Sequence, residues 1–244
     1  MLREDNSTPP AQGPILYTDS MVTSKTEQVT RKTHQGRHTR RSILTTAARV
    51  ASVDGLEGLT LGQLAGELGM SKSGLFAHFG SKEELQLATV EHARKLYVDQ
   101  VLIPGQAHPR GLATLYGLCR EYVSLMERGV FPGGCFFAGV MAEFDARPGA
   151  VRDRVAAIQR AWLDSLERAA REGIERGELR TSTDPGQLAF ELEAAILSAN
   201  WYYHLYADRD YFRRARVAVQ SSLKSKATAK GGRTLQAAFV ETTS

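Results

Sequence analysis

Apolar residues recur at helical spacing along most of the chain between residues 40 and 223. Residues 40–53 place apolar side chains on one face, namely Ile43, Leu44, Ala47, Val50 and Ala51, before Asp54-Gly55 ends the pattern. Residues 61–68 repeat this arrangement behind Thr60, a good N-cap residue, with Leu61, Leu64, Ala65 and Leu68 on a shared face. No alternating pattern typical of strands competes with these segments. The sequence therefore predicts an all-α fold.

The same spacing predicts longer helices over 82–102, 109–128, 134–145, 148–176, 185–206 and 211–223. Pro104-Gly105 is expected to end the first of these, and Pro148 and Gly177 mark the first turn and the end of the fourth. Residues 1–36 and 224–244 are rich in small polar residues and glycine with little periodicity, so both are expected to be disordered or flexible.

The stretch MSKSGLFAHFGSKEEL, residues 70–85, contains two helix starts close together. Ser71 and Ser81 are each suited to an N-cap, Glu84 completes a capping box with Ser81, and Gly80 is a stop signal between them. The enclosed helix spans about two turns and is too short to be stable by propensity alone. Its presence calls for a tertiary or functional reason.

A helix-turn-helix supplies that reason, with residues 61–68 as its first helix and Gly69 in the turn. Leu75 and Phe79 would anchor the short helix on its neighbours, and its outer face would carry Ser71, Lys72, Ser73, Gly74, Phe76 and His78. Such a helix fits a DNA major groove, where small residues allow close approach and polar ones bond phosphates or bases. Lys82, at the next helix start, would hold a phosphate together with backbone N–H groups. A sharp corner in a helical bundle is the competing interpretation.

Charge is distributed unevenly along the chain. Residues 31–80 hold seven Lys and Arg against three Asp and Glu, whereas residues 81–219 hold 18 against 19. A polyanion partner for the first block and an ordinary solvated face explain the charge about equally well. The basic block, the short helix and the glycine turn coincide within fifty residues, and together they favour DNA binding.

The run TLGQLAGELGMSKSGLFAHFGSKEEL resembles the DNA-binding domain of the TetR/AcrR family of transcriptional regulators. The matching features include Ala65, Gly69, Ser71-Lys72, Leu75, His78-Phe79 and Ser81 to Leu85, and the preceding RRSILTTAARVASVDGLEGLTL is similar to the family's first helix. The resemblance is close over residues 38–100. One departure is Phe76, where the family usually has a Tyr whose hydroxyl meets a phosphate; Phe76 would make an apolar contact instead, such as with a thymine methyl.

The resemblance implies a helix-turn-helix domain over 37–97, with the motif at 60–79, and a helical effector-binding and dimerisation domain over 98–223. DNA contacts are then expected from Arg40, Thr60, Ser71, Lys72, Ser73, Gly74, Phe76, His78 and Lys82. Arg37, Arg40 and Arg41 would reach phosphates or a minor groove, with a solvated basic linker as an equal alternative. The resemblance further implies a homodimer formed by the last two helices and a palindromic operator from which an effector releases the protein.

Aromatic and soft side chains of the second domain are candidates for an effector site. These are Tyr116, Cys119, Phe137, Met141, Phe144, Trp162, Trp201 and Tyr202, with Phe136 and His204 beside them. Ordinary core packing explains any one of them at least as well. Few charges fall on these faces apart from Glu143 and Glu193, so an apolar or aromatic effector is expected.

Other classes of protein are disfavoured by the sequence. No constellation of nucleophile, base or metal ligands can be assembled, so neither an enzyme, a metal site nor a cofactor is expected. Cys119 and Cys135 form no disulfide framework, and no secretion signal or membrane-spanning run is present, which predicts a cytoplasmic protein. A helical interaction protein, or a regulator without a small-molecule effector, is the alternative to an effector-controlled repressor.

Overall fold

The computed structural model describes the backbone of residues 20–240 and the side chains of residues 36–240. It is all-α, as predicted: no strand occurs in this range, and the single isolated β-bridge joins Leu179 and Ala227. The chain divides into two compact units between Arg41 and Ser42, and all the contacts described below lie within the second unit.

The helix-turn-helix occupies the predicted positions. It comprises the end of α1 (Ser20–Asp54), α2 (Leu61–Leu68) and α3 (Lys72–Phe76), followed by α4 (Lys82–Tyr97). Residues 20–36, which the sequence predicts to be disordered, form the first part of α1 in the structure; residues 1–19 lie outside the described range. Residues 20–36 contain no proline, so the backbone can continue as a helix over this stretch.

The helix that begins at Lys82 does not end at Pro104. It passes from α4 through a π-helical turn η1 (Val98–Leu102) into α5 (Ile103–Gln106). The expected stop at Pro104 is therefore wrong. The π-helical turn η1 shifts the backbone hydrogen bonds from their α-helical partners, and Pro104 lies in the first turn of α5, where the absence of an N–H group costs little. Gly105 then allows close contact with the next helix, since a Cβ there would lie 2.9 Å from the Cα of Leu118.

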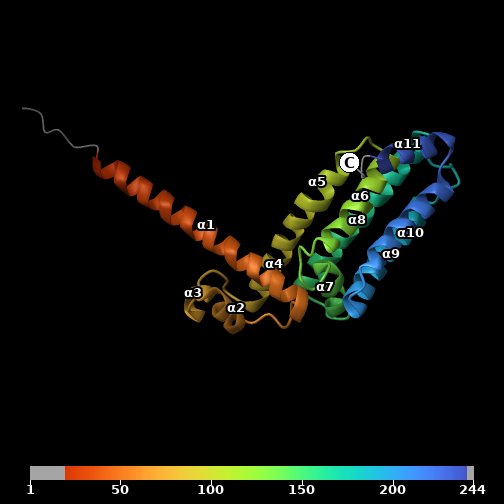
Figure 1. The fold of residues 1–244 in the computed structure, drawn as a ribbon. Coiled ribbons are helices and arrows are strands. Elements are labelled where there is room, and N and C mark those ends of the chain that lie inside the picture. The colour runs from red at the N-terminus through yellow and green to blue at the C-terminus, as the bar shows by residue number, and fades with distance from the viewer. Residues whose placement is uncertain (1–19, 241–244) are drawn as a thin grey trace, which may run out of the picture. The chain divides into compact units, whose positions relative to one another are not determined.

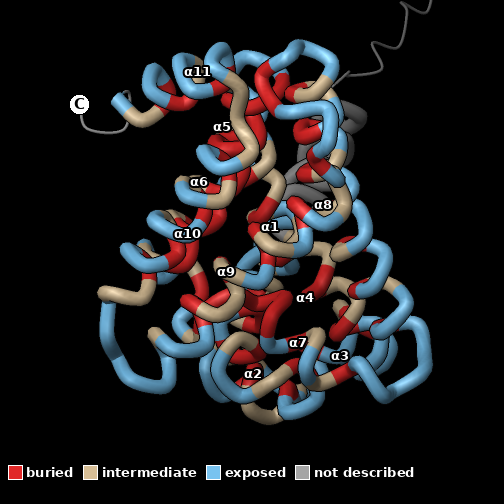
Figure 2. The backbone as a smooth tube through the Cα atoms, turned by 90° about the vertical axis from the view of Figure 1, so that its right-hand side faces the viewer, coloured by how far each residue is buried: buried red, intermediate tan, exposed pale blue. Residues whose placement is uncertain are grey.

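The body of the protein is built around α6 (Leu112–Glu127), which packs against α5, α8 (Ala150–Glu175), α10 (Asp210–Lys226) and α11 (Ala229–Val240). Figure 1 shows α6 running beside α5 and α8, and α9 (Pro185–Tyr206) beside α10. The shorter α7 (Phe136–Phe144) contacts α8. Figure 2 shows buried residues on the inner sides of these helices and exposed residues on their outer sides.

The C-terminal segment is helical rather than flexible, which corrects the expectation for residues 224–240. Leu235 and Ala238 of α11 are buried, and the ring of Phe239 stands 4.7 Å from that of Tyr116. Gly231 makes this packing possible, because a Cβ there would lie 1.9 Å from the carbonyl oxygen of Glu178. The glycines that suggested a flexible tail are therefore points of close helix contact. Residues 241–244 lie outside the described range.

Candidate DNA interface and ligand cavities

The outward face of α3 is the candidate DNA interface. Leu75 and Phe79 are 0% and 1% exposed and hold the short helix on the core, as predicted. The side chains of Ser71, Lys72 and Ser73 are exposed, Gly74 and His78 are half-buried, and Phe76 is 51% exposed. A large apolar side chain exposed among small polar ones fits a surface that another molecule covers.

Local caps fix the direction of α3 and α4. The Ser71 hydroxyl accepts a hydrogen bond from the Gly74 N–H at 3.1 Å, and the Ser81 hydroxyl accepts one from the Glu84 N–H at 3.1 Å. The Glu84 carboxylate accepts from the Gly80 N–H at 2.9 Å, one residue before the N-cap that a standard capping box would use. Both predicted helix starts are therefore present, and they lie ten residues apart.

Lys72 and Thr60 lie beside each other at the start of α2. A Cβ on Gly62 would lie 3.5 Å from the Lys72 ammonium nitrogen and 3.9 Å from the Thr60 hydroxyl, so this glycine leaves room for the lysine. Thr60 caps α2 by accepting from the Gln63 N–H at 3.1 Å. An ammonium group beside a helix N-terminus is an arrangement that suits a phosphate.

Lys82 has a structural partner that the sequence did not reveal. Its ammonium donates to the backbone carbonyl of Glu57 at 2.7 Å and to the Glu57 carboxylate at 2.9 Å. The hydrogen bond from Lys82 is the main cause that lowers the pKa of Glu57 below its usual value. Lys82 thus ties α4 to the loop before α2, and a phosphate would have to share it. Arg40 is exposed on α1.

The body holds the DNA-binding domain through Glu143 of α7. Its carboxylate accepts hydrogen bonds from the backbone N–H groups of Leu56 and Glu57, both at 2.7 Å. Gly55 has a φ of +82°, and a Cβ there would come within 3.0 Å of the same carboxylate. Gln86 of α4 donates to the Leu56 carbonyl at 3.1 Å. Because Glu57 also binds Lys82, the loop connects α7 with the helix that follows α3.

A second connection joins α4 to α8. The Glu91 carboxylate binds the guanidinium groups of Arg94, at 2.8 Å, and of Arg154. The hydrogen bond from Arg154 is the main cause that lowers the pKa of Glu91. The helical pattern revealed neither this link nor the role of Glu143, because partners 63 and 87 residues apart leave no local signal.

The structure places the predicted effector residues in several parts of the body. Cys119 and Phe137 are buried in its core, and Tyr116 is buried against Phe239 of α11. Met141 and Phe144 line a cavity between α7 and α8, and Trp162 lines another beside α4. Trp201 and Tyr202 are 53% and 45% exposed, which places them on the surface rather than around an interior cavity. The helix they belong to is apolar nearly all round, so the sequence could not show which side faces inward.

An aromatic cluster with a buried carboxylate fills the centre of the body. The rings of Tyr97, Tyr122 and Trp162 meet edge to face at centroid distances of 5.3–5.4 Å. Glu193 is 6% exposed and accepts hydrogen bonds from the Trp162 indole at 2.6 Å and from the Gln159 amide at 2.9 Å. Burial raises the pKa of Glu193, and these two hydrogen bonds oppose the rise.

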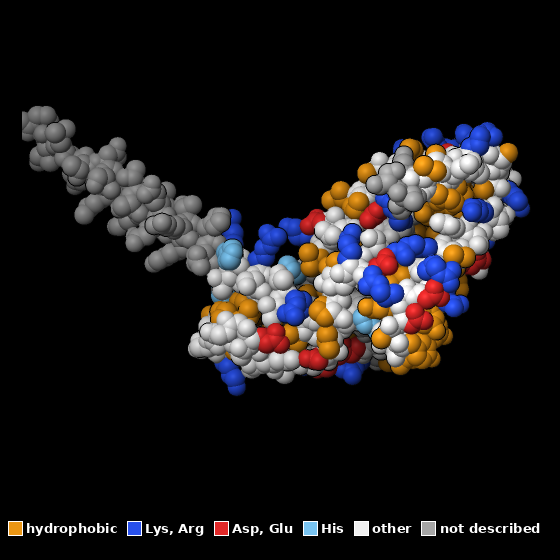
Figure 3. All heavy atoms as spheres, in the orientation of Figure 1, with side chains coloured by type: hydrophobic (Ala, Val, Ile, Leu, Met, Phe, Trp, Pro, Cys, Tyr) orange, Lys and Arg blue, Asp and Glu red, His pale blue; other side chains and the backbone are white. Residues whose placement is uncertain are grey.

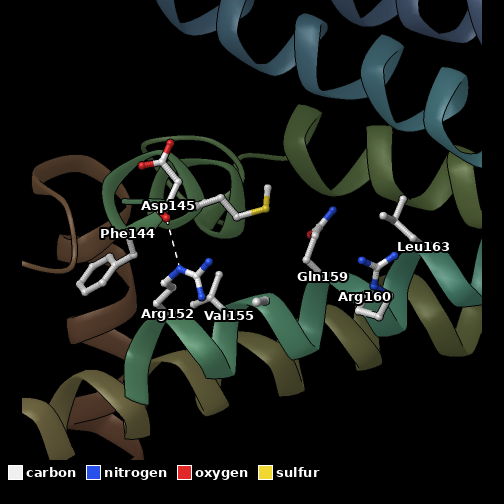
Figure 4. Close-up of a pocket in the computed structure, with 9 residues that line it drawn as sticks. Phe144, Asp145, Arg152, Val155, Gln159, Arg160 and Leu163 are labelled. Carbon is white, nitrogen blue, oxygen red and sulfur yellow. Dashed lines mark hydrogen bonds between the residues drawn. The ribbon is translucent and has the colours of Figure 1, made fainter. Parts of the chain in front are cut away.

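Two of the cavities that α8 lines exceed 300 Å³. The first, about 330 Å³, lies between α7 and α8, and Figure 4 shows it with Phe144 and Asp145 at the end of α7 and Val155, Gln159 and Arg160 on α8. The Arg152 guanidinium donates to the Asp145 carbonyl at 3.2 Å at its edge. The second, about 390 Å³, lies between α8 and the α4–η1 segment, with Tyr97 and Trp162 in its wall. Both volumes fall in the range of small-molecule sites.

Both cysteines are buried thiols. The Cys135 sulfur lies 3.1 Å from the Tyr122 hydroxyl, and burial raises the pKa of the Cys119 and Cys135 thiols. Neither thiol has the exposure or the lowered pKa of a reactive cysteine. Within residues 36–240 no group of acidic, His and Cys side chains is arranged to hold a metal ion. Between Ser20 and Val240 no helix has both the length and the hydropathy of a transmembrane span.

The chain matches two domain families that belong together. Residues 43–89 match the description "Bacterial regulatory proteins, tetR family", and residues 111–219 match "Tetracyclin repressor-like, C-terminal domain". The first match contains the α2–α3 corner, and the second contains the body from α6 to α10. The chain therefore belongs to the TetR family of DNA-binding transcriptional regulators.

Solved structures show the same fold. A TetR regulator from Chloroflexus aurantiacus is 24% identical with a TM-score of 0.74, over 80% of this chain and 98% of that one. AibR, crystallised with isovaleryl coenzyme A and operator DNA, is 26% identical with a TM-score of 0.60, over 75% and 96%. A regulator from Saccharomonospora viridis in complex with choline is 21% identical with a TM-score of 0.67, over 78% and 98%. No curated protein sequence matches the chain.

Proposed function

We propose that this protein is a homodimeric repressor that binds a palindromic operator and leaves it when a small molecule binds in the body. The observation that carries the proposal is the exposed face of α3, where Lys72 reaches the first turn of α2 and no acidic side chain occurs from residue 70 to residue 78. A regulator of this kind acts on DNA, so we place it in the cytoplasm and assign it no enzymatic step.

An exposed apolar surface on α9 and α10 supports the dimer. It consists of Phe190, Trp201, Tyr202, Leu205, Tyr206 and Val217, which are 45–70% exposed. Figure 3 shows apolar side chains gathered at the lower right of the body, where Figure 1 places the turn between α9 and α10. Apolar surface of this extent usually marks an interface. A two-fold axis through it would present two α3 helices for half-sites about 34 Å apart.

The two connections between the body and the DNA-binding domain support release by an effector. A ligand that moves α7 or α8 acts on Leu56 and Glu57 through Glu143, and on α4 through Arg154. The fold relatives bound to isovaleryl coenzyme A and to choline carry ligands of opposite charge, so they support an effector without fixing its class. A coupling free energy of about 1–3 kcal/mol between the two sites is typical of such switches.

Operator binding by matched lysine variants tests the proposal. DNA retained by the protein from fragmented genomic DNA is sequenced, and affinity for the recovered site is measured by fluorescence anisotropy over a range of salt concentrations. Lys72→Ala removes the cation beside α2 from both subunits, so it should weaken binding at least tenfold and reduce the salt slope by about two, one for each half-site. Lys95→Ala removes another exposed lysine, at the end of α4, and should change neither.

Several results would contradict the proposal. If the recovered DNA shared no inverted repeat, the palindromic operator would be contradicted. If the two lysine variants had equal effects, the α3 face would not be the contact surface. If sedimentation analysis at micromolar concentration showed a monomer, the dimer would be contradicted. Absence of any DNA binding would favour the alternative, a helical interaction protein.

A further inference from the structure

The cavity between α8 and the α4–η1 segment has a basic lining. Arg94 comes from α4, and Arg154 and Arg168 come from α8, against one lining carboxylate, Asp164. The wall behind them is apolar and buried, with Tyr97, Ile158 and Trp162 4–8% exposed. A cavity with a basic rim and an apolar interior is complementary to a molecule with an anionic head and an apolar tail.

The three arginines differ in their salt-bridge partners. Arg94 and Arg154 share the Glu91 carboxylate, whereas Arg168 makes no salt bridge or side-chain hydrogen bond to any residue in the described range. Arg168 also lines a neighbouring hollow of about 250 Å³ between α5 and α8, together with Ser165. Arg168 also lies close enough to Glu172, in the lining of the second hollow, to interact with it electrostatically. Since no carboxylate binds the Arg168 guanidinium directly, it is available to a ligand that extends along α8.

A buried polar group in the same wall lacks a partner. The Tyr97 hydroxyl is the one buried side-chain nitrogen or oxygen in the described residues that makes no hydrogen bond. An unpaired buried hydroxyl destabilises the fold and is retained where something compensates for it. A ligand oxygen in the cavity would accept its proton, and an anionic oxygen would do so best.

We propose that this cavity binds an organic anion, a carboxylate or phosphate monoester on an apolar tail, which takes Arg154 and Arg168 as its charge partners in competition with Glu91. Glu91 lies on α4 and Arg154 on α8, so binding would replace the salt bridge that joins the DNA-binding domain to the body. The inference deepens the proposed function by naming the chemical class of the effector, and only its consequence for DNA rests on that function.

A cationic ligand is the strongest competing class, because Glu193 lies behind Trp162. Its carboxylate, however, already accepts from Trp162 and Gln159, and Glu193 is not among the residues that line the cavity. Three arginines are among them, and they would repel a cation. The geometry therefore favours the anion, and the cation becomes an outcome of the test.

The test follows the indole N–H resonances of the two tryptophans in a ¹H–¹⁵N spectrum without DNA. Trp162 lines the cavity and Trp201 is on the surface, so the second peak is an internal control, and Trp201→Phe assigns it. The probes are octanoate, octyl phosphate, the neutral octanamide and octyltrimethylammonium. Either or both anions should shift the Trp162 peak saturably below about 1 mM, and octanamide should bind at least tenfold more weakly.

Three variants locate the site. Arg168→Gln should weaken binding of the anion at least tenfold, whereas Arg160→Gln, on the same helix but lining the α7–α8 cavity, should leave it unchanged. Glu91→Gln removes the competitor of the anion and should strengthen binding severalfold, an effect that general damage to the fold would not produce.

Any one of four results would overturn the inference. Neither anion shifts the Trp162 peak at 5 mM, or octanamide binds with the same affinity as the anions. Alternatively, the cation binds more tightly than the anions, or the two arginine variants have equal effects. The proposed function is tested separately by operator affinity in the same samples. Saturable anion binding without any change in operator affinity would leave the cavity assignment standing and contradict release by this effector. If the operator were bound normally but no anion bound the protein, the cavity assignment would be contradicted and the DNA-binding function would stand.

Discussion

The α2–α3 corner and the junction between α7 and the α1–α2 loop both hold backbone N–H groups against side-chain oxygens, but over very different sequence distances. Ser71 caps Gly74, three residues away, whereas Glu143 binds the N–H of Leu56, 87 residues away. The corner can form its DNA-facing shape from its own sequence. Its orientation on the body depends on a few long-range contacts, so shape and orientation should respond to different mutations.

The largest effect is expected from Gly133→Ala, because Gly133, just before α7, packs directly against the backbone of α1. A Cβ at Gly133 would lie 1.7 Å from the carbonyl oxygen of Ser52, a backbone atom of α1 that can move only with its helix. Overpacking against backbone should lower the free energy of unfolding by about 3 kcal/mol or more. Thermal and urea unfolding followed by circular dichroism measure the loss.

Gly139→Ala is the matched control for this change. Gly139 is exposed on α7, and a Cβ there would meet nothing within 4 Å. Alanine should stabilise the helix by about 0.5–1 kcal/mol. If both glycine variants behaved alike, the close approach of Gly133 to α1 would be wrong.

Glu143→Gln should have the next largest effect, because it removes the charge that two backbone N–H groups share. One oxygen of the amide can still accept, but its NH₂ group would face the other N–H. Loss of one charge-assisted hydrogen bond should cost about 1.5–3 kcal/mol. Urea unfolding measures it, with Glu67→Gln on the exposed side of α2 as a control that should change stability by less than about 0.5 kcal/mol.

Ser71→Ala tests the corner and should have a smaller effect on global stability. Removal of an N-cap hydroxyl costs about 1 kcal/mol, and Ser71→Asn, which keeps a capping oxygen, should cost only a few tenths. Hydrogen exchange at the Gly74 amide should accelerate in the alanine variant by more than exchange in α6 does. If exchange accelerated equally in α3 and α6, the corner would not be stabilised by its own local contacts.

These two regions also explain what the sequence could predict. Thr60, Ser71 and Ser81 revealed their helix starts because a cap and its N–H partner lie within three residues, and Leu75 and Phe79 revealed the inner face of α3 through helical spacing. These signals are local, and they gave the helix-turn-helix nearly residue by residue.

Signals that depend on distant partners were lost or misread. Lys82 resembled a free phosphate ligand because Glu57, its partner, is 25 residues away. Trp201 resembled a pocket residue because an all-round apolar helix gives no direction, and Gly231 resembled a tail residue because its neighbour Glu178 is remote in sequence. The arginine-lined cavity is assembled from α4 and α8 and had no signature within either helix.

An effect confined to a range of pH is expected from Glu193→Gln in the core of the body, which should change how stability depends on pH. Burial raises the pKa of Glu193 in the folded protein above the value of 4.5 for an ordinary Glu, so the folded state binds this proton more tightly than the unfolded state. Its contribution to stability is therefore greatest below pH 4.5 and is lost as pH rises through the raised pKa. Relative to the glutamine variant, the wild type should lose stability over that window, by at most about 1.4 kcal/mol per pH unit. Parallel stability curves of the two proteins between pH 4 and 7 would contradict the assignment.

The position of α11 has a consequence for how the protein is made. Leu112, the first residue of the central helix α6, donates its N–H to Glu178, and Gly231 of α11 packs on the backbone of the same glutamate. The segment that covers the start of the central helix is thus made after α6 to α10. A nascent chain can complete its DNA-facing corner early, but its body stays open at one end until α11 has left the ribosome.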